Sequence, residues 1–441
     1  LQMLDKRLSM GADFYMDQRR NMLVSAGSLF SEVIGTGVPK QCIGAVDTKG
    51  LEVSLTWRDK VGEAFNYYVG GNFSSMKTEI IENGDECCIA YGRGKADGQI
   101  NSYRIGSQMN VMMHGLFSRI TDRHGLYSKV ATRKLIKKIE EYRPDVIHLH
   151  NIHGYYLNYE ILFSYLKESC IPIIWTLHDC WSFTGHCAYY DYIGCDKWMK
   201  ECDKCEQKRT YPASFFLSDS RNNYARKKNA FCKCPNLTLV TPSKWLAEEV
   251  KKSFLKEYDV QVIYNGIALE LYHPQKVDNG NLDRKLDLEN KFVILGVANV
   301  WEERKGLYIL EKIADMAISN WQVVVVGDID GRDKRENVIY IQRTDSAEKL
   351  AELYARADVF VNPTFEDNFP TTNIEALASG TPVITFHTGG SPEAIDCRTG
   401  YCVEKGDVNQ LIDCIQKIED GAIVRKNCIE RSKRFSKEQS Y

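Results

Sequence analysis

Residues 359–393 read VFVNPTFEDNFPTTNIEALASGTPVITFHTGGSPE, and this stretch decides how the rest of the chain is interpreted. The run Val359–Asn362 is short and apolar, as is typical of a strand buried in a parallel sheet. After a loop that begins at Pro363, the apolar spacing predicts a helix at Thr372–Ser379 and another strand at Pro382–Phe386. This order of elements predicts a βαβ unit.

The loop and the start of this helix carry the groups with candidate chemistry. Thr372-x-x-Glu375 has the spacing of a capping box, which predicts that the helix begins here. Helix N-termini offer unpaired amides and partial positive charge, so Thr371 and Thr372 are candidate diphosphate ligands. Glu366 or Asp367, together with Glu375, would lie on either side of that diphosphate site. From these residues alone two interpretations stay open: a nucleotide site, or a helix cap beside solvated loop acids.

The same alternation of strand, loop and helix occurs in two blocks of the chain. It predicts an α/β fold with two Rossmann-like, doubly wound domains that face each other across a cleft. We expect an unassigned segment at 1–60, an N-terminal domain at 61–274, a linker at 275–290 and a C-terminal domain at 291–441. The elements that support this division are strands at Asp145–Leu149, Ile171–Leu177, Phe292–Val297 and Gln322–Val326, and helices at Tyr159–Glu168, Leu307–Ser319 and Ala347–Ala355.

The first part of the chain is harder to interpret. Met10–Met22 has a loosely helical, charged character. Phe65–Val69 is predicted as a short strand that runs into Gly70-Gly71, followed by a helix to Glu82. The pair Asn83-Gly84 predicts a turn, and Cys87–Tyr91 predicts a strand. Pro274–Asn290 is polar and aperiodic, which predicts a linker without regular structure.

Composition and charge exclude several classes of protein. The 441 residues include 57 basic and 59 acidic side chains, a net charge of −2. That balance argues against nucleic acid as the main partner. No apolar run approaches the length of a membrane-spanning helix. Because no signal peptide is recognisable either, the sequence favours a cytoplasmic location.

Two local clusters stand out from this even background. Cys187, Cys195, Cys202 and Cys205 offer four thiols in one short stretch, and the last two have the spacing of a zinc knuckle. A structural zinc, free buried thiols and a catalytic metal all remain open. Residues 115–143 hold eight basic side chains against three acidic ones. This surplus fits either a solvated helix face or contact with an anionic membrane.

The stretch that ends in Glu375 resembles the acid-x7-Glu signature of retaining glycosyltransferases of family 4, which have the GT-B fold. Alignment on Phe369 and Glu375 places Asp367 at the first acid, with Glu366 one residue earlier. The resemblance implies that the first acid lies near the donor sugar. It also implies that Glu375 holds the ribose hydroxyls of the nucleotide. The turn at Thr388–Glu393 resembles the glycine-rich turn of the family near the donor.

Further matches extend the resemblance over roughly residues 65–435. Lys305 before Gly306 implies a cation on the donor diphosphate; the usual Arg is missing, and Arg304 is the candidate substitute. His178 after a strand matches the family histidine that faces the donor sugar. Gly70-Gly71 resembles the first glycine-rich loop of the family. The segments 148–156 and 175–187 are most similar to bacterial exopolysaccharide and colanic-acid-type enzymes.

The resemblance implies a function in surface-polysaccharide synthesis. Such an enzyme would move a sugar from a UDP- or GDP-sugar to a hydroxyl of a lipid-linked oligosaccharide. It would need no metal for catalysis and would work in the cytoplasm, at the inner face of the plasma membrane. The missing Arg and the Asp at the first acid position keep a second hypothesis open. In that alternative, the chain is a weak or inactive relative that binds nucleotide sugar as an assembly or regulatory subunit.

Overall fold

The computed structural model describes residues 2–3, 8–25, 40–61, 65–82, 87–94, 101–272, 274, 279–316, 318, 320–329, 331, 333–342 and 346–439. The chain divides into two compact units, one formed mainly by residues up to 89 and the other mainly by residues 102–441. Each unit is described by itself below.

The first unit is an antiparallel sheet in the order β1-β2-β3-β4. The predictions for this region are wrong in two places. Met10–Met22 lies in a strand rather than a helix, and the expected strand, glycine loop and helix of residues 65–82 form one continuous strand. Gly70 and Gly71 lie inside that strand, paired with Thr56 and Leu55 of its neighbour. The expected turn at Asn83-Gly84 lies outside the described residues. The strands are β1 (Gln2–Met3), β2 (Leu8–Ser25), β3 (Lys40–Val61) and β4 (Phe65–Glu82).

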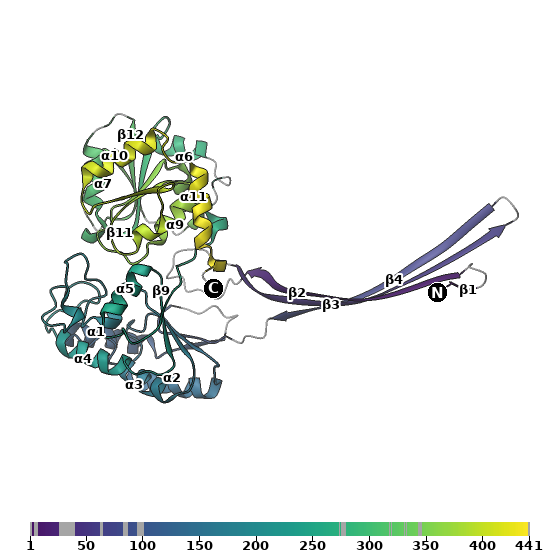
Figure 1. Ribbon diagram of the computed structural model, residues 1–441, viewed down its shortest axis with the longest axis horizontal. Coiled ribbons are helices and arrows are strands. Elements are labelled where there is room, and N and C mark those ends of the chain that lie inside the picture. The colour runs from purple at the N-terminus through teal and green to yellow at the C-terminus, as the bar shows by residue number, and fades with distance from the viewer. Residues whose placement is uncertain are drawn as a thin grey trace. The chain divides into compact units, whose positions relative to one another are not determined.

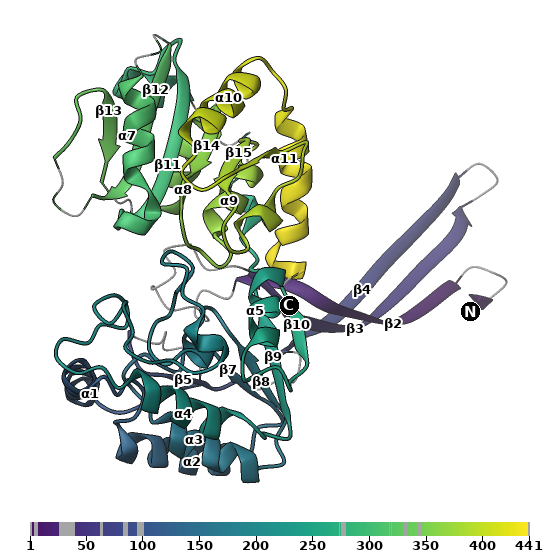
Figure 2. The same cartoon turned by 60° about the vertical axis from the view of Figure 1, so that its left-hand side comes forward.

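The N-terminal half of the second unit is built on a parallel sheet in the order β10-β9-β8-β7 (Figures 1 and 2). The helix predicted at Tyr159–Glu168 is confirmed at both ends, and the predicted strands are present but shorter. The strands are β5 (Ile89–Tyr91), β6 (Ser102–Arg104), β7 (Ile147–Leu149), β8 (Ile173–Thr176), β9 (Leu237–Thr241) and β10 (Val260–Val262). The helices are α1 (Gln108–Thr121), α2 (Lys129–Tyr142), α3 (Tyr159–Glu168), α4 (Ser220–Phe231) and α5 (Lys244–Lys252), with 3₁₀ turns η2 (Trp181–Phe183), η3 (Lys197–Met199) and η4 (Leu269–Leu271).

The C-terminal half has a parallel sheet in the order β13-β12-β11-β14-β15-β16, with helices on both faces (Figures 1 and 2). Strands β11 and β14 are neighbours, so the loops that follow them leave the same edge of the sheet. The strands are β11 (Phe292–Val300), β12 (Trp321–Asp328), β13 (Val338–Ile341), β14 (Val359–Asn362), β15 (Val383–Phe386) and β16 (Gly400–Val403). The helices are α7 (Leu307–Asp315), α8 (Ala347–Arg356), α9 (Thr371–Ala378), α10 (Val408–Glu419) and α11 (Arg425–Ser432), with 3₁₀ turns η6 (Glu303–Lys305), η7 (Ser391–Ala394), η8 (Lys433–Phe435) and η9 (Lys437–Gln439).

The region between the two sheets differs from the sequence prediction. The expected linker contains a helix, α6 (Asn279–Leu286). The last described residues also return to the start of this region, because Ile267 N donates to Phe435 O at 3.0 Å and Lys437 N donates to Ile267 O at 3.2 Å. The start of the connection is therefore held to the last described residues by two hydrogen bonds.

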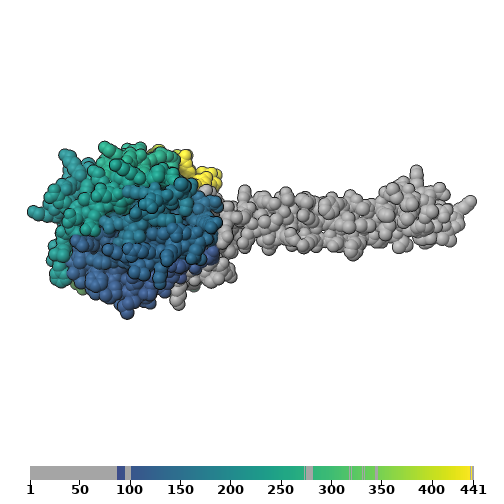
Figure 3. Space-filling model, turned by 90° about the horizontal axis from the view of Figure 1, so that it is seen from below, coloured from purple at the N-terminus to yellow at the C-terminus, as the bar shows by residue number. Residues whose placement is uncertain are grey.

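Each half of the second unit has its own apolar core. The central strand β14 is entirely buried, and so are Val383, Ile384 and Phe386 of β15. This pattern is typical of strands covered on both faces, which explains why their short apolar runs are visible in the sequence. In the space-filling view, the dark blue residues that include α1 and α2 lie on the outer surface (Figure 3). The predicted class, two Rossmann-like domains of α/β type, is confirmed.

Candidate functional site

Two loops at the carboxyl edge of the C-terminal sheet bring the predicted cations and acids together. Lys305 Nζ donates to Asp367 Oδ2 at 2.6 Å, although the residues are far apart in sequence. Arg304 Nη1 donates to the carbonyl of Glu366 at 3.2 Å, and Phe365 N donates to the carbonyl of Arg304 at 2.8 Å. Lys305, which follows β11, and Asp367, which follows β14, therefore form one ion pair.

Gly306 allows these loops to approach so closely. Its φ of +74° lies in the left-handed region, and a Cβ there would lie 2.2 Å from the carbonyl oxygen of Pro363. No side chain can occupy that position without moving the backbone. The Lys305-Gly306 pair thus has a physical basis: the glycine permits the contact, and the lysine before it reaches Asp367.

Glu366 and Asp367 lie in different environments. Glu366 is buried, and its Oε2 accepts a hydrogen bond from Tyr192 N at 2.6 Å. Burial raises the pKa of the Glu366 carboxyl, while the Tyr192 N–H and Arg304 oppose that rise. The side chain of Asp367 keeps 20% exposure beside Lys305. Of the two acids, Asp367 is therefore the more accessible to a ligand.

Asn368, which the sequence analysis did not single out, links these loops to the N-terminal half. Its Oδ1 accepts a hydrogen bond from Ser243 Oγ at 2.6 Å, and its Nδ2 donates to the carbonyl of His178 at 3.1 Å. Gly390 N donates to the carbonyl of Asn368 at 2.8 Å, and a Cβ on Gly389 would lie 1.7 Å from the carbonyl oxygen of Asp367. The predicted glycine turn therefore packs directly against the loop that carries the acids.

Glu375 lies on α9 but does not cap it. The N-cap of α9 is Pro370, without a side-chain cap, so the predicted capping box at Thr372 is wrong. Glu375 Oε2 instead accepts a hydrogen bond from the hydroxyl of Tyr354 at 3.0 Å, and Thr371 supplies a second hydrogen bond. Burial raises the pKa of Glu375 to about 6, a rise that these two hydrogen bonds limit.

This raised pKa leads to a prediction for stability. Folded Glu375 has a pKa of about 6 against an ordinary value of 4.5, so the unfolded chain ionises first as the pH rises. Its contribution to stability is complete below about pH 4.5 and is lost as the pH rises through 6, in total about 2 kcal/mol. Glu375→Gln cannot ionise and keeps an oxygen that accepts from Tyr354. We expect its free energy of unfolding, relative to wild type, to rise by about 2 kcal/mol between about pH 4 and about pH 7.5. Denaturant unfolding at both pH values measures this, and a pH-independent difference would contradict it.

His178, which the sequence predicts at a strand end, lies in a row with His150 and His148 of the N-terminal half. His178 Nε2 and His150 Nδ1 lie 3.0 Å apart, and the His148 ring lies 4.2 Å from that of His150 between centroids. Burial lowers the pKa of His178, and burial together with its two histidine neighbours lowers that of His150 to about 4. His153 contacts Asp179 instead, with Nε2 at 3.3 Å from Oδ2. The row is therefore uncharged at neutral pH.

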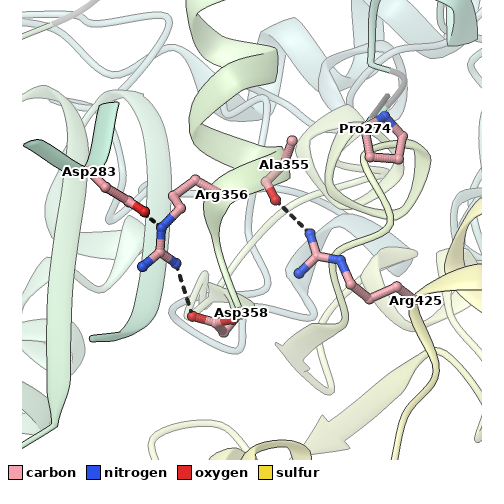
Figure 4. A pocket seen from close by; sticks show the side chains of 6 residues that line it. All are labelled: Pro274, Asp283, Ala355, Arg356, Asp358 and Arg425. Atoms are coloured by element: carbon pink, nitrogen blue, oxygen red, sulfur yellow. Dashed lines mark hydrogen bonds and ion pairs between the residues drawn. The ribbon is translucent and has the colours of Figure 1, made fainter. Parts of the chain in front are cut away.

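A cavity of about 450 Å³ lies away from these loops, between Pro274, Asp283 and the start of α11 (Figure 4). Its two guanidinium groups already have partners. Arg356 contacts Asp283 and donates to Asp358 at 3.2 Å, and Arg425 donates to the carbonyls of Ala355 and Ala357. Because these arginines fasten α6 and α11 to the end of α8, we assign the cavity a structural role.

The four predicted cysteines line one small cavity together with His186. None of them forms a disulfide. Gly185 N donates to Cys202 Sγ at 3.1 Å, and the thiols of Cys187 and Cys205 are hydrogen-bonded to each other. Among the described residues, the group whose ligand atoms lie within 4.8 Å of one another is instead Asp122, His124 and His186.

Comparison with known proteins supports the resemblance that the motifs indicate. Residues 82–271 match the model of "Glycosyltransferase Family 4", and residues 291–420 match that of "Glycosyl transferases group 1". The chain belongs to the glycosyltransferases of group 1 and family 4. The first of these matches begins at the last residue of β4, so the glycosyltransferase region lies mainly in the second unit.

The glycosyltransferase has relatives in bacterial polysaccharide synthesis. It is 24% identical over 360 residues to WcaC of Escherichia coli K12, named for colanic acid biosynthesis, covering 76% of this chain and 84% of that one. It is 26% identical over 200 residues to an Escherichia coli galactosyltransferase named for a GlcNAc-diphosphoundecaprenol substrate, and 28% identical over 176 residues to the capsular polysaccharide enzyme CapM of Staphylococcus aureus. These two matches cover 41% and 37% of this chain, and 51% and 45% of the relatives, about half of their length.

Solved glycosyltransferases share the GT-B fold. Sucrose-phosphate synthase of Thermosynechococcus elongatus superposes with a TM-score of 0.52 at 20% identity, covering 70% of this chain and 75% of that one. HepE of Anabaena, solved with UDP, gives 0.50 at 18% identity, with 72% and 81% covered. In the part of the glycosyltransferase that the structure describes, no helix combines the length and apolar character needed to cross a bilayer.

Proposed function

We propose that this glycosyltransferase is a retaining enzyme that transfers a sugar from a UDP- or GDP-sugar to a hydroxyl of a lipid-linked oligosaccharide in exopolysaccharide or capsule synthesis. The observation that carries the proposal is the Lys305–Asp367 ion pair. It lies at the carboxyl edge of the C-terminal sheet, where doubly wound folds bind nucleotides. The names of the two Escherichia coli relatives support the class of acceptor and product.

The cations near this edge would act on the leaving group. Departure of the nucleotide leaves negative charge on the diphosphate, and a positioned ammonium stabilises that charge as it develops. Among the described residues, the Lys305 ammonium donates to Asp367, and its side chain keeps 23% exposure. Arg304 is more committed, because it contacts Glu302, the carbonyl of Glu366 and the ring of Tyr189. Lys305 is therefore the main diphosphate ligand in this proposal, and the amides at Thr371 and Thr372 add to it.

The remaining predicted residues would hold the sugar and the ribose. Glu375 accepts a hydrogen bond from the Tyr354 hydroxyl, and its carboxylate would accept in the same way from the paired ribose hydroxyls. Asp367 would orient the sugar, while His178 would contact its reacting face, joined to the acid loop through Asn368. An uncharged imidazole there can donate or accept a hydrogen bond without competing with the diphosphate for Lys305. Gly70 and Gly71 are not included, because they lie within β4 of the other unit.

A donor panel tests this function directly. The protein is incubated with UDP- and GDP-sugars, first alone and then with a polyprenyl-diphosphate-linked saccharide, and both nucleotide release and the anomer of the product are measured. Transfer with retention supports the proposal. Binding of a donor without release or transfer would favour the regulatory alternative instead, and inversion would contradict the retaining mechanism.

Helix α1 and a nearby loop offer a surface that suits a lipid acceptor. Phe216 in the loop has 74% exposure. Six apolar side chains of α1 are also exposed: Met109, Met112, Met113, Leu116, Phe117 and Ile120. The loop is held beside α1, because Phe215 N donates to the carbonyl of Arg119 at 2.8 Å. The following helix α2 carries exposed lysines and arginines. Apolar side chains beside basic ones are the combination that anionic bilayers bind.

We therefore expect the protein to sediment with vesicles of phosphatidylglycerol and phosphatidylcholine and much less with phosphatidylcholine alone. Met112→Ser combined with Phe216→Ser should weaken binding at least about tenfold, because both changes remove exposed apolar surface. Val424→Ser, an exposed apolar position on the C-terminal half, is the control and should bind like wild type. Equal binding of all three proteins would contradict a membrane role for α1.

A further inference from the structure

The cysteine segment, residues 184–219 between η2 and α4, is long and has little regular structure. All of its residues are described, and its single 3₁₀ turn is η3. Segments of this length without helices or strands are uncommon inside compact domains and need another source of order. Part of that order comes from apolar packing, since Trp198 is fully buried against Phe183 and Tyr190.

The cysteine segment also reaches the acid loop of the C-terminal half. Tyr192 N donates to Glu366, Asp191 Oδ2 accepts from Thr388 Oγ1 at 3.1 Å and from Lys405 Nζ at 2.5 Å, and Tyr189 lies under Arg304 at 5.0 Å. Contacts to Glu366 and to the glycine turn therefore come from a segment that has hydrogen-bonded turns but no α-helix or strand. Whatever fixes this segment also positions the contacts.

The four cysteines lie around one cavity in this segment. Cys187 comes before these contact residues and Cys195 after them, while Cys202 and Cys205 come later in the segment. The cavity has room of about 20 Å³, enough for one ion or one water molecule. One backbone amide already points at a sulfur, that of Gly185 at Cys202. Sulfur is the preferred donor for tetrahedral zinc, and four thiolates complete a closed structural site.

A buried cation beside the thiols is a second, independent observation. Lys227 of α4 has 1% exposure, and its ammonium donates to the carbonyls of Trp181 and Thr184 at 2.6 and 3.0 Å. Its Nζ also lies 3.5 Å from the centroid of the Trp181 ring. Among the described residues, no carboxylate forms an ion pair with it within 4.0 Å, and the groups that oppose the effect of burial on its pKa are Cys202 and Cys187, followed by Asp179 and Asp122. Burying an ammonium is costly unless negative charge lies nearby. Zinc with four thiolates carries two negative charges and would supply it.

We propose that Cys187, Cys195, Cys202 and Cys205 bind a structural zinc ion that fixes the cysteine segment against the acid loop. Binding draws the four sulfurs together and releases the thiol protons to solvent. The neighbouring group of Asp122, His124 and His186 is the weaker candidate because its carboxylate is already engaged, although His124 Nδ1 and His186 Nε2 have no hydrogen-bond partner among the described residues. Asp122 Oδ1 already accepts hydrogen bonds from His186 Nδ1 and from Ser214 Oγ.

Metal analysis tests the site without reference to activity. The full chain is purified without added zinc or chelator, and about one zinc per chain is expected by mass spectrometry. Cys202→Ser combined with Cys205→Ser should lose it. The matched control is Cys170→Ser combined with Cys397→Ser, two exposed cysteines outside the segment, and it should keep the metal. Zinc absent from wild type, or retained in the first variant, would overturn the proposal.

Two measurements on wild type guard against a variant that fails to fold. Cobalt exchanged into the protein should give the absorption bands of a tetrahedral thiolate site, and bands of nitrogen and oxygen ligation alone would overturn the proposal. Removal of zinc with a mercurial and a chelator should speed proteolysis within residues 184–219 about tenfold, because the segment then opens. Unchanged cleavage would overturn its role in fixing the segment. Neither measurement depends on transferase activity, so a failure of the proposed function remains distinguishable.

Discussion

Replacing Lys305 by alanine is expected to lower the rate of sugar transfer about 10²–10³-fold. The ammonium of Lys305 has fewer contacts than Arg304 and donates to Asp367. In the proposed reaction it stabilises the diphosphate as negative charge develops there, so its loss raises the barrier more than it weakens the binding of free nucleoside. Lys305→Arg should restore little, since a planar guanidinium does not replace a compact ammonium in a fitted position.

Steady-state kinetics with saturating acceptor measures this effect. Lys312→Ala, an exposed lysine on α7, is the matched control and should leave the rate unchanged. Arg304→Ala should cost less than Lys305→Ala, because Arg304 already bonds to Glu302 and to the carbonyl of Glu366. If Arg304→Ala abolishes transfer while Lys305→Ala is nearly as active as wild type, the assignment of the diphosphate ligand is wrong.

Replacing each of the two adjacent acids by alanine is expected to affect a different property, the transfer rate for Asp367 and the stability for Glu366. Asp367→Ala should lower transfer about 10²-fold, with little change in stability, because this carboxylate is partly exposed beside Lys305. Glu366→Ala should reduce the free energy of unfolding by about 1–3 kcal/mol, because the Tyr192 N–H loses its acceptor. Asp367 is then a ligand of the sugar, and Glu366 joins the cysteine segment to the acid loop.

Each variant is measured both by transfer rate and by denaturant unfolding. Asp413→Ala, an exposed acid on α10, serves as the control for both readouts. A loss of transfer in Glu366→Ala at wild-type stability, together with an active Asp367→Ala, would exchange the two assignments. Equal behaviour of both variants would show that the environments of the two carboxyls do not separate their roles.

Local patterns predicted elements whose buried residues recur at a regular spacing, both the fully buried strand β14 and helix α3, which buries one face. Strand Val359–Asn362 and helix Tyr159–Glu168 agree with the structure at both ends. Burial on a regular period leaves a signal in a short window of sequence, and such elements need little else to be recognised. The long strands of residues 8–25 and 65–82 were missed, because what stabilises a strand is its partner strand, and that partner is not visible locally.

The sequence predicted most residues of the candidate site but not the contacts between them. Lys305, Asp367 and Glu375 were identified because their motifs resemble those of family 4 glycosyltransferases, and spacing alone left their roles open. The structure assigned Glu375 to Tyr354 rather than to a helix cap, because the buried hydroxyl of Tyr354 reaches its carboxylate from α8. Asn368 and Tyr192 were missed altogether. Their role depends on partners in the other half of the unit, at separations that no local pattern reports.

By itself, then, the sequence determined the two parallel sheets, the strand ends that carry charge and the family to which the chain belongs. Those properties depend on burial period and on residue types at short spacing, which are local. Only the tertiary structure decided that Lys305 meets Asp367, that Glu366 is buried under the cysteine segment and that the four thiols surround one cavity beside Lys227. These contacts arise where loops of different strands converge. The partners are selected by hydrogen-bond geometry and burial, which do not depend on distance along the sequence.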